Sequence, residues 1–328
     1  MSELSAQLLN FATAYVAPFS NYSEIRTEHL ADAFRGHFGL SSFPTMQQLE
    51  ECCASMGIEL SSMQISIDDL DGINAWYGEG NPLIQLRQDL TLARAETTLG
   101  HELREVIENA FVKVKPTYVP LLTHNNRRMN RQSDHFAACL LMESDATRRS
   151  LTSLGYDYVE FSRQSGRSLP SVIVRLQTLY PAGSGEATPV GGVWLFEAPW
   201  VDVKQGRSRA RDLRVLYGAK LNGFTTSRAN RSLTATLARD VFPRIGQQAE
   251  GMHCVADALV IRQPTSRVVR GFDLFRERDW LLVAEPFHVR GYPWRCLLTA
   301  ARLDFQGMVQ PWLTRCGPMQ LPELYQSA

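Results

Sequence analysis

The sequence predicts an α+β protein built from more than one domain. Helical periodicity dominates residues 1–180 apart from a short β-like stretch, whereas residues 187–328 alternate short apolar runs with basic, helix-like pieces. The chain has 328 residues, and a domain usually has about 100–200. Because 44% of the residues are hydrophobic and 21% are charged, the chain can form apolar cores and is not disordered throughout.

Three helices are predicted before residue 57. Apolar residues recur at helical spacing from Leu4 to Val16, and a second helix is expected over residues 23–38. Thr45 is suited to be the N-cap of a third helix that runs to Met56, and Gly57 fits the position after its end.

A three-strand meander is expected next, and it leads directly into a helix over residues 91–111. The strands are predicted at 58–67, 73–77 and 83–87, with a turn at 78–82. Further helices are expected at 126–142, 145–154, 157–165 and 169–179. The segment 180–186 contains proline and glycine and therefore predicts a linker before a separate α+β domain at 187–328.

Charge, hydropathy and cysteine content exclude several classes of protein. The formal net charge is zero, so no overall field recruits nucleic acid or an acidic membrane. No run of about 18 apolar residues is present, and the N-terminus lacks the basic start and apolar stretch of a signal peptide. The six cysteines form no Cys-x-x-Cys pair, which predicts buried, reduced thiols in a cytoplasmic protein.

The predicted helix at 91–111 carries a metal-site pattern. His101 and Glu105 stand at positions i and i+4, which places both on one helical face within reach of a single ion. Glu102 follows the first ligand position, where a carboxylate can take a proton from metal-bound water as a general base. Taken alone, the pattern favours a solvated helical face that bears Glu102, Arg104, Glu105 and Glu108, with Arg104 and Glu108 as an ion pair.

Two blocks of sequence resemble the ImmA/IrrE family of zincin metallo-endopeptidases. The first covers residues 97–105, TTLGHELRE, and the second covers residues 134–142, DHFAACLLM. The similarity extends over residues 25–180. It implies a zincin-like peptidase domain at 1–145, a helical segment similar to a helix-turn-helix at 146–182, and a GAF-like sensory domain at 187–328.

The resemblance also implies an activity and a ligand set. The expected activity is metal-dependent cleavage of a repressor-like regulatory protein in a stress or defence response. Zinc is the expected metal, and manganese is an alternative because oxygen-rich ligands tolerate a harder ion. The family's third metal ligand is a glutamate, and the corresponding residue here is Asn130, a poor zinc ligand. Asp134, one turn further on, is a second candidate, and His124 and His135 are others.

Two ligand positions depart from the family's pattern, because Glu105 stands in place of a histidine and Asn130 in place of a glutamate. A second function therefore stays open. The chain would then be a catalytically inactive, metal-free relative that binds a protein or nucleic-acid partner. Residues 162–175 have the spacing of a helix-turn-helix, but the family context favours packing against the peptidase core. Positive charge concentrates at 204–239, which predicts either a nucleic-acid or anion patch or a solvated helix face. The central residues of this group are Arg207, Arg209, Arg211 and Arg214.

Overall fold

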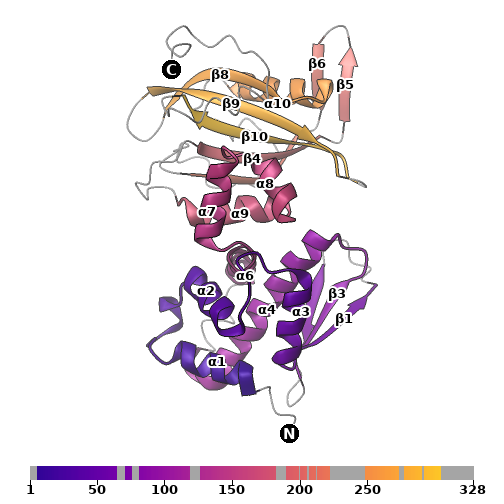
Figure 1. Ribbon diagram of the computed structural model, residues 1–328. Coiled ribbons are helices and arrows are strands. Elements are labelled where there is room, and N and C mark those ends of the chain that lie inside the picture. The colour runs from indigo at the N-terminus through magenta and orange to yellow at the C-terminus, as the bar shows by residue number, and fades with distance from the viewer. Residues whose placement is uncertain are drawn as a thin grey trace. The chain divides into compact units, whose positions relative to one another are not determined.

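The computed structural model contains both helices and sheets, which confirms the predicted α+β class (Figure 1). It describes residues 6–64, 71–75, 81–118, 126–181, 190–198, 200–204, 207–211, 213–221, 248–272, 277–289 and 292–303. The chain divides into two compact units. The first comprises Met1–Ser150 and Ser162–Thr178, and the second comprises Leu151–Phe161 and Leu179–Ala328.

The first unit begins with short helices that carry clear capping signals. These elements are α1 (Ala6–Val16), the 3-10 turn η1 (Tyr22–Glu24), α2 (Thr27–Phe38) and α3 (Met46–Ser55). Thr45 caps α3 as predicted, in a capping box with Gln48. The helix predicted over 23–38 is instead divided into η1 and α2, because Ile25 and Arg26 adopt extended backbone conformations between them.

Among the described residues, a three-stranded sheet follows with an order that differs from the predicted meander. Its strands are β1 (Glu59–Met63), β2 (Gly72–Ala75) and β3 (Leu83–Arg87), in the order β1-β3-β2. Strand β1 pairs parallel to β3, and β2 pairs antiparallel to it. The meander prediction is therefore wrong. Strand β3 carries the buried Ile84 and Leu86, whereas β1 is largely exposed, so the most apolar strand takes the central position.

Helix α4 (Leu92–Val114) packs against strands β2 and β3 and also against helix α6 (Asn126–Leu141) (Figure 1). Gly100 allows the close approach of α4 and α6, because a Cβ atom there would lie 3.0 Å from Ala137 Cβ. Gly72 has the same role between β2 and α4, since its Cβ would lie 2.6 Å from Thr98 Cγ2. The short turn η2 (Pro116–Tyr118) follows α4.

Two buried arginines hold the C-terminal end of α6. Arg35 donates to the carbonyl oxygens of Cys139 and Leu140, and Arg175 Nε donates to the carbonyl oxygen of Met142 at 2.7 Å. These carbonyls lack partners within the helix, and the positive side chains also oppose its negative end. The end of α6 is therefore fixed from both α2 and α9. The remaining helices of this region are α7 (Ser144–Ser153), α8 (Tyr158–Ser165) and α9 (Leu169–Leu179).

The segment 162–175, which has the spacing of a helix-turn-helix, contacts α4 and the residue before the N-cap of α3. Arg167, between α8 and α9, forms a buried ion pair with Glu96 of α4 and donates to the carbonyl oxygen of Pro44 at 2.6 Å. Ser171 of α9 lies 2.8 Å from Thr97 of α4. Residues 162–178 therefore pack as part of the first unit, as the family context suggested.

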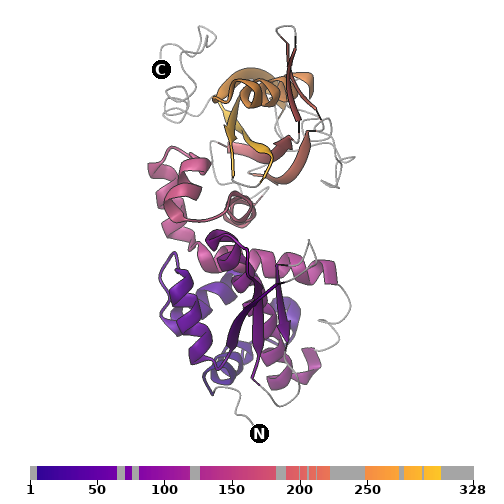
Figure 2. The ribbon, with the colours of Figure 1, turned by 90° about the vertical axis from the view of Figure 1, so that its right-hand side faces the viewer.

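The described part of the second unit contains a five-stranded antiparallel sheet in the order β7-β4-β10-β9-β8. Helix α10 lies across one of its faces (Figure 2). A separate hairpin consists of β5 and β6. The elements are β4 (Val190–Ala198), β5 (Trp200–Lys204), β6 (Arg207–Arg211), β7 (Arg214–Lys220), α10 (Gln248–Ile261), β8 (Thr265–Phe272), β9 (Glu277–Phe287) and β10 (Trp294–Arg302).

One local expectation for this region is wrong. The basic piece Arg207–Arg211 is not helix-like, because it pairs with β5 as strand β6. The apolar run Cys254–Ile261 lies in α10, where Val255 and Leu259 stand one helical turn apart and pack against the sheet. Most of the predicted linker at 180–186 lies outside the described residues.

Cysteine burial agrees with the sequence. The described cysteines Cys52, Cys53, Cys139, Cys254 and Cys296 are buried free thiols, and Cys316 lies outside the described residues. Within the described part of the chain, no helix combines the length and apolar character needed to cross a bilayer.

Candidate functional site

His101, on α4, lies between two carboxylates. Its Nδ1 is 2.9 Å from Asp134 Oδ1 on α6, and its Nε2 is 3.3 Å from Glu105 Oε1, one turn further along α4. The close packing of α4 and α6 at Gly100 brings Asp134 to the ring. Each ring nitrogen of His101 therefore faces a different carboxylate.

Glu102 points toward the sheet and meets Asn74 of strand β2. The Nδ2 atom of Asn74 lies 2.6 Å from Glu102 Oε2 and also 2.6 Å from Glu105 Oε2. The sequence motifs did not identify Asn74, because it belongs to a short strand distant in sequence from the His-Glu segment. The available signal was a polar residue within a partly buried strand of otherwise small and apolar residues, Gly72–Ala75.

These contacts set the protonation of the site. Burial alone would lower the pKa of His101, but the hydrogen bonds with Asp134 and Glu105 outweigh it and raise this pKa to about 10. The hydrogen bond from His101 is also the main cause that lowers the pKa of Glu105. Burial raises the pKa of Glu102, although the hydrogen bond from Asn74 opposes this shift. At neutral pH, His101 is thus an imidazolium that donates from both nitrogens.

The other predicted site residues do not join this group. Asn130 lies one turn before Asp134 on α6 and is exposed to solvent. Burial is the main cause that lowers the pKa of His135, and the nearby Arg131 lowers it further. His124 lies outside the described residues.

The solvated-face interpretation of the motif is wrong. Glu102, Arg104 and Glu108 are all buried, with exposures of 7%, 1% and 2%. The expected Arg104–Glu108 ion pair is present, at 2.6 Å from Arg104 Nε to Glu108 Oε1, but it lies inside the core. The neighbouring face of α4, about 60° around the helix, carries His101 and Glu105, which retain partial exposure.

The residues present do not fit a zinc site with three protein ligands. Within the described residues, no group of three His, Cys, Asp or Glu side chains is arranged to hold a metal ion. A catalytic zinc uses three protein ligands and keeps a fourth position open. An ion at His101 Nε2 could also contact Glu105, but Asp134 lies on the other ring nitrogen. Asp134 instead matches the carboxylate that orients a histidine ring through its second nitrogen.

Fold and motif together define a zincin-like peptidase domain in the first unit. Residues 53–177 match the family Peptidase_M78, which is described as the IrrE N-terminal-like domain. Residues 53–177 are therefore similar to the IrrE N-terminal-like domain, as the resemblance to the ImmA/IrrE family predicted.

One solved structure extends the comparison beyond this domain. It is a Mycobacterium tuberculosis transcriptional regulator, with a TM-score of 0.56 and 13% sequence identity over 95% of this chain and 85% of that chain. At this identity the match shows a shared fold. The comparison with curated proteins gave no match.

Two further features lie away from His101 and its carboxylate partners, Glu105 and Asp134. Arg207, Arg209 and Arg211 occupy alternate positions of β6, and Arg214 is exposed at the start of β7. The predicted anion patch stays a prediction, because the side chains of β6 lie outside the described part of the structure.

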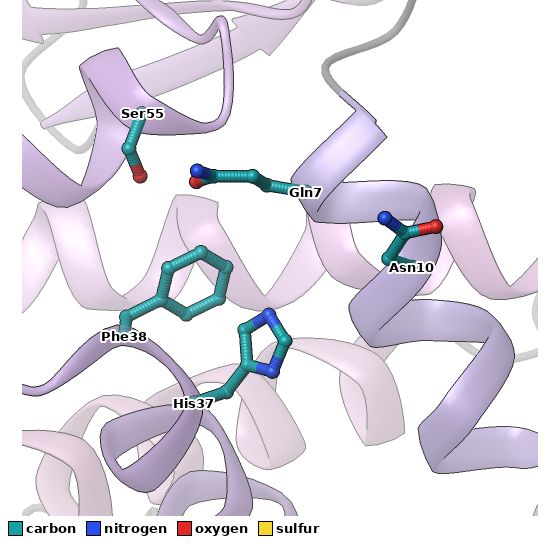
Figure 3. A pocket seen from close by; sticks show the side chains of 5 residues that line it. All are labelled: Gln7, Asn10, His37, Phe38 and Ser55. Atoms are coloured by element: carbon teal, nitrogen blue, oxygen red, sulfur yellow. The ribbon is translucent and has the colours of Figure 1, made fainter.

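Separately, an open cavity of about 470 Å³ lies between α1, α2 and α3 (Figure 3). It is lined by Gln7, Asn10, His37, Phe38 and Ser55.

Proposed function

We propose that this chain is a regulatory protein whose IrrE N-terminal-like domain binds a partner protein and does not act as a metallopeptidase. The observation that carries the proposal is the placement of His101 between Glu105 and Asp134, one on each ring nitrogen. This arrangement is complete as an imidazolium with two carboxylate partners. Asp134 lies on Nδ1 of the ring, so it does not share His101 Nε2 with Glu105 as a third ligand of one ion would.

The structural neighbour supports a regulatory role. That protein is a transcriptional regulator, and its fold corresponds to this chain over 95% of the length. In our proposal the second unit, with its five-stranded sheet and α10, is a GAF-like sensory domain that controls partner binding. The buried free thiols support a reducing, cytoplasmic location.

Metal content and partner binding test the proposal. Protein purified without chelators is expected to contain far less than one equivalent of zinc or manganese. Capture of its partner is expected to survive Glu102→Gln, which removes the acid–base group but keeps the side-chain shape. One equivalent of metal that is lost in Glu105→Ala, together with proteolysis that is abolished in Glu102→Gln, would contradict the proposal.

One observation favours a second candidate, a metallo-endopeptidase that cleaves a repressor-like protein in a stress or defence response. His101 Nε2 and Glu105 Oε1 are 3.3 Å apart, a separation that two ligands of one zinc ion would have. Asp134 orients the ring as in many zinc sites. This candidate needs a third ligand, from a rearranged Asn130 or from residues outside the described part. The same metal analysis decides between the two candidates.

A further inference from the structure

The amide group of Asn74 occupies the space between the carboxylates of Glu102 and Glu105. Its nitrogen is 2.6 Å from one oxygen of each. An ionised carboxylate only accepts hydrogen bonds, so the amino group of Asn74 must face the pair, with its carbonyl oxygen directed elsewhere. Each of its two N–H bonds then serves one carboxylate. A divalent cation bridging the same oxygens would occupy this position.

The strand that carries Asn74 is held firmly against α4. The backbone of Asn74 also hydrogen-bonds to the Glu102 carboxylate. Two residues earlier, a Cβ atom at Gly72 would lie 2.6 Å from Thr98 Cγ2 and 3.3 Å from Glu102 Oε1. This close approach fixes the distance between β2 and the carboxylates, so the Asn74 contact follows from backbone packing and is not a chance side-chain rotamer.

These polar contacts form one continuous series across β2, α4 and α6. It runs from Glu102 to Asn74 of β2, then to Glu105, His101 and finally Asp134 of α6. Carboxylates alternate along it with nitrogen-bearing groups: carboxylate, amide, carboxylate, imidazole, carboxylate. Protein groups make every contact in this series, so the series from Glu102 to Asp134 is continuous without a metal ion.

We propose that Asn74 is a positioning residue that replaces the metal ion, because its amide holds the Glu102–Glu105 pair together without a cation. This inference rests on the proposed non-peptidase function. It predicts that one substitution, Asn74→Asp, creates a metal site. Asn74→Asp would place a third carboxylate against the pair, and the resulting repulsion is relieved by a divalent cation bound to these oxygens and His101. An oxygen-rich set of this kind suits manganese or zinc.

The experiment compares the full-length chain with Asn74→Asp, Asn74→Ala and a control, Asn109→Asp. Asn109 is exposed on α4, so its variant makes the same charge change on the supporting helix. Zinc and manganese are titrated by calorimetry, and the melting temperature is measured with and without each metal. The unaltered chain and the control are expected to bind neither metal. Asn74→Asp is expected to bind one equivalent and to gain about 5–10 °C at metal concentrations 100-fold above Kd.

Asn74→Ala provides the second readout. Without metal its melting temperature is expected to fall, because the carboxylates lose their shared donor, and added zinc is expected to restore part of the loss. If Asn74→Asp does not fold, as judged by circular dichroism, the effect of zinc on the melting temperature of Asn74→Ala tests the inference in its place. An Asn74→Asp protein that folds but binds no metal, or an Asn74→Ala protein indifferent to zinc, overturns the inference while leaving the proposed function intact. Stoichiometric metal in the unaltered chain, with Glu102-dependent proteolysis, refutes the proposed function itself.

Discussion

Helix α4 carries two acid–base pairs at the same spacing but in different surroundings. His101–Glu105 lies on the side facing β2 and α6, with side-chain exposures of 21% and 27%. Arg104–Glu108 lies in the core, with exposures of 1% and 3%. The core pair is completed by Tyr22, whose hydroxyl contacts both partners. Spacing alone therefore does not determine what a pair does, because burial decides whether it is a structural ion pair or an accessible polar group.

The buried pair and the partly exposed pair respond differently to the loss of a partner. A fully buried charge that loses its partner has no water to replace it, so the core pair is costly to break and unsuited to exchange ligands. The His101 pair keeps contact with solvent and can change its partners. This difference explains how one helix can hold the domain together through one face and present a polar group on the neighbouring face.

The largest expected effect comes from breaking the core pair. Arg104→Ala leaves the Glu108 carboxylate uncompensated and should lower the free energy of unfolding by about 3–5 kcal/mol. The contact of Arg104 with the Phe136 ring, 5.8 Å from its centroid, is lost as well. Urea denaturation followed by circular dichroism measures the change.

A triple variant separates charge from packing in this pair. Tyr22→Phe, Arg104→Met and Glu108→Leu together remove the polar groups but keep volume, so the protein should be nearly as stable as the original or more stable. A loss below about 1 kcal/mol for Arg104→Ala would mean that water reaches the pair, and the contrast between the two sides of α4 would then disappear.

A smaller effect is expected where α4 meets α6. Gly100→Ala and Gly36→Ala gain similar helix propensity, about 1 kcal/mol. A Cβ atom at Gly36 meets nothing within 4 Å, whereas at Gly100 it lies 3.0 Å from Ala137 Cβ and 3.1 Å from its Cα. Gly36→Ala should therefore stabilise the protein, and Gly100→Ala should be about 1–3 kcal/mol less stable than Gly36→Ala because of overpacking.

The same pair of variants also reports on the site. A shift of α6 away from α4 in Gly100→Ala would lengthen the His101–Asp134 contact, which is visible as a changed His101 ring resonance in NMR spectra. Equal stability of the two alanine variants would show that α6 moves freely and does not fix Asp134.

Local patterns made part of this architecture predictable. Helical periodicity and capping signals located α3, α4 and α6 to within a few residues, because these signals depend on neighbours in sequence. The i, i+4 rule also placed His101 and Glu105 on one face. The suggestion that Asp134 approaches the same group was geometrically sound, although the structure brings it to Nδ1.

Long-range features were not predictable from the same patterns. Asn74 enters the site through the order β1-β3-β2, and a sequence pattern does not reveal which strand lies beside α4. The two pairs on α4 look alike in sequence, since their difference arises from what packs around each. The basic residues of β6 were misjudged as helix-like because a short segment carries too few turns to distinguish the two periodicities.

The smallest expected effect on stability comes from Asp134→Asn, because Asp134 is 55% exposed. At neutral pH the loss should be below about 1 kcal/mol. The pH dependence is more informative. The pKa of His101 is about 10 in the folded protein against an ordinary value of 6.5. The folded state therefore holds the proton more tightly, and the stabilisation is fully present below about pH 6.5 and is lost as the pH rises through about 10.

Without the Asp134 carboxylate, the pKa of His101 should fall and the loss of stability should begin at lower pH. NMR titration of the His101 ring and urea denaturation between pH 6 and 10 measure both quantities. Glu50→Gln removes an exposed carboxylate from α3 and should leave the His101 pKa unchanged. If Asp134→Asn behaves like this control, Glu105 alone holds the ring. The site would then depend on α4 by itself, and the packing of α6 would be irrelevant to the polar side of the helix.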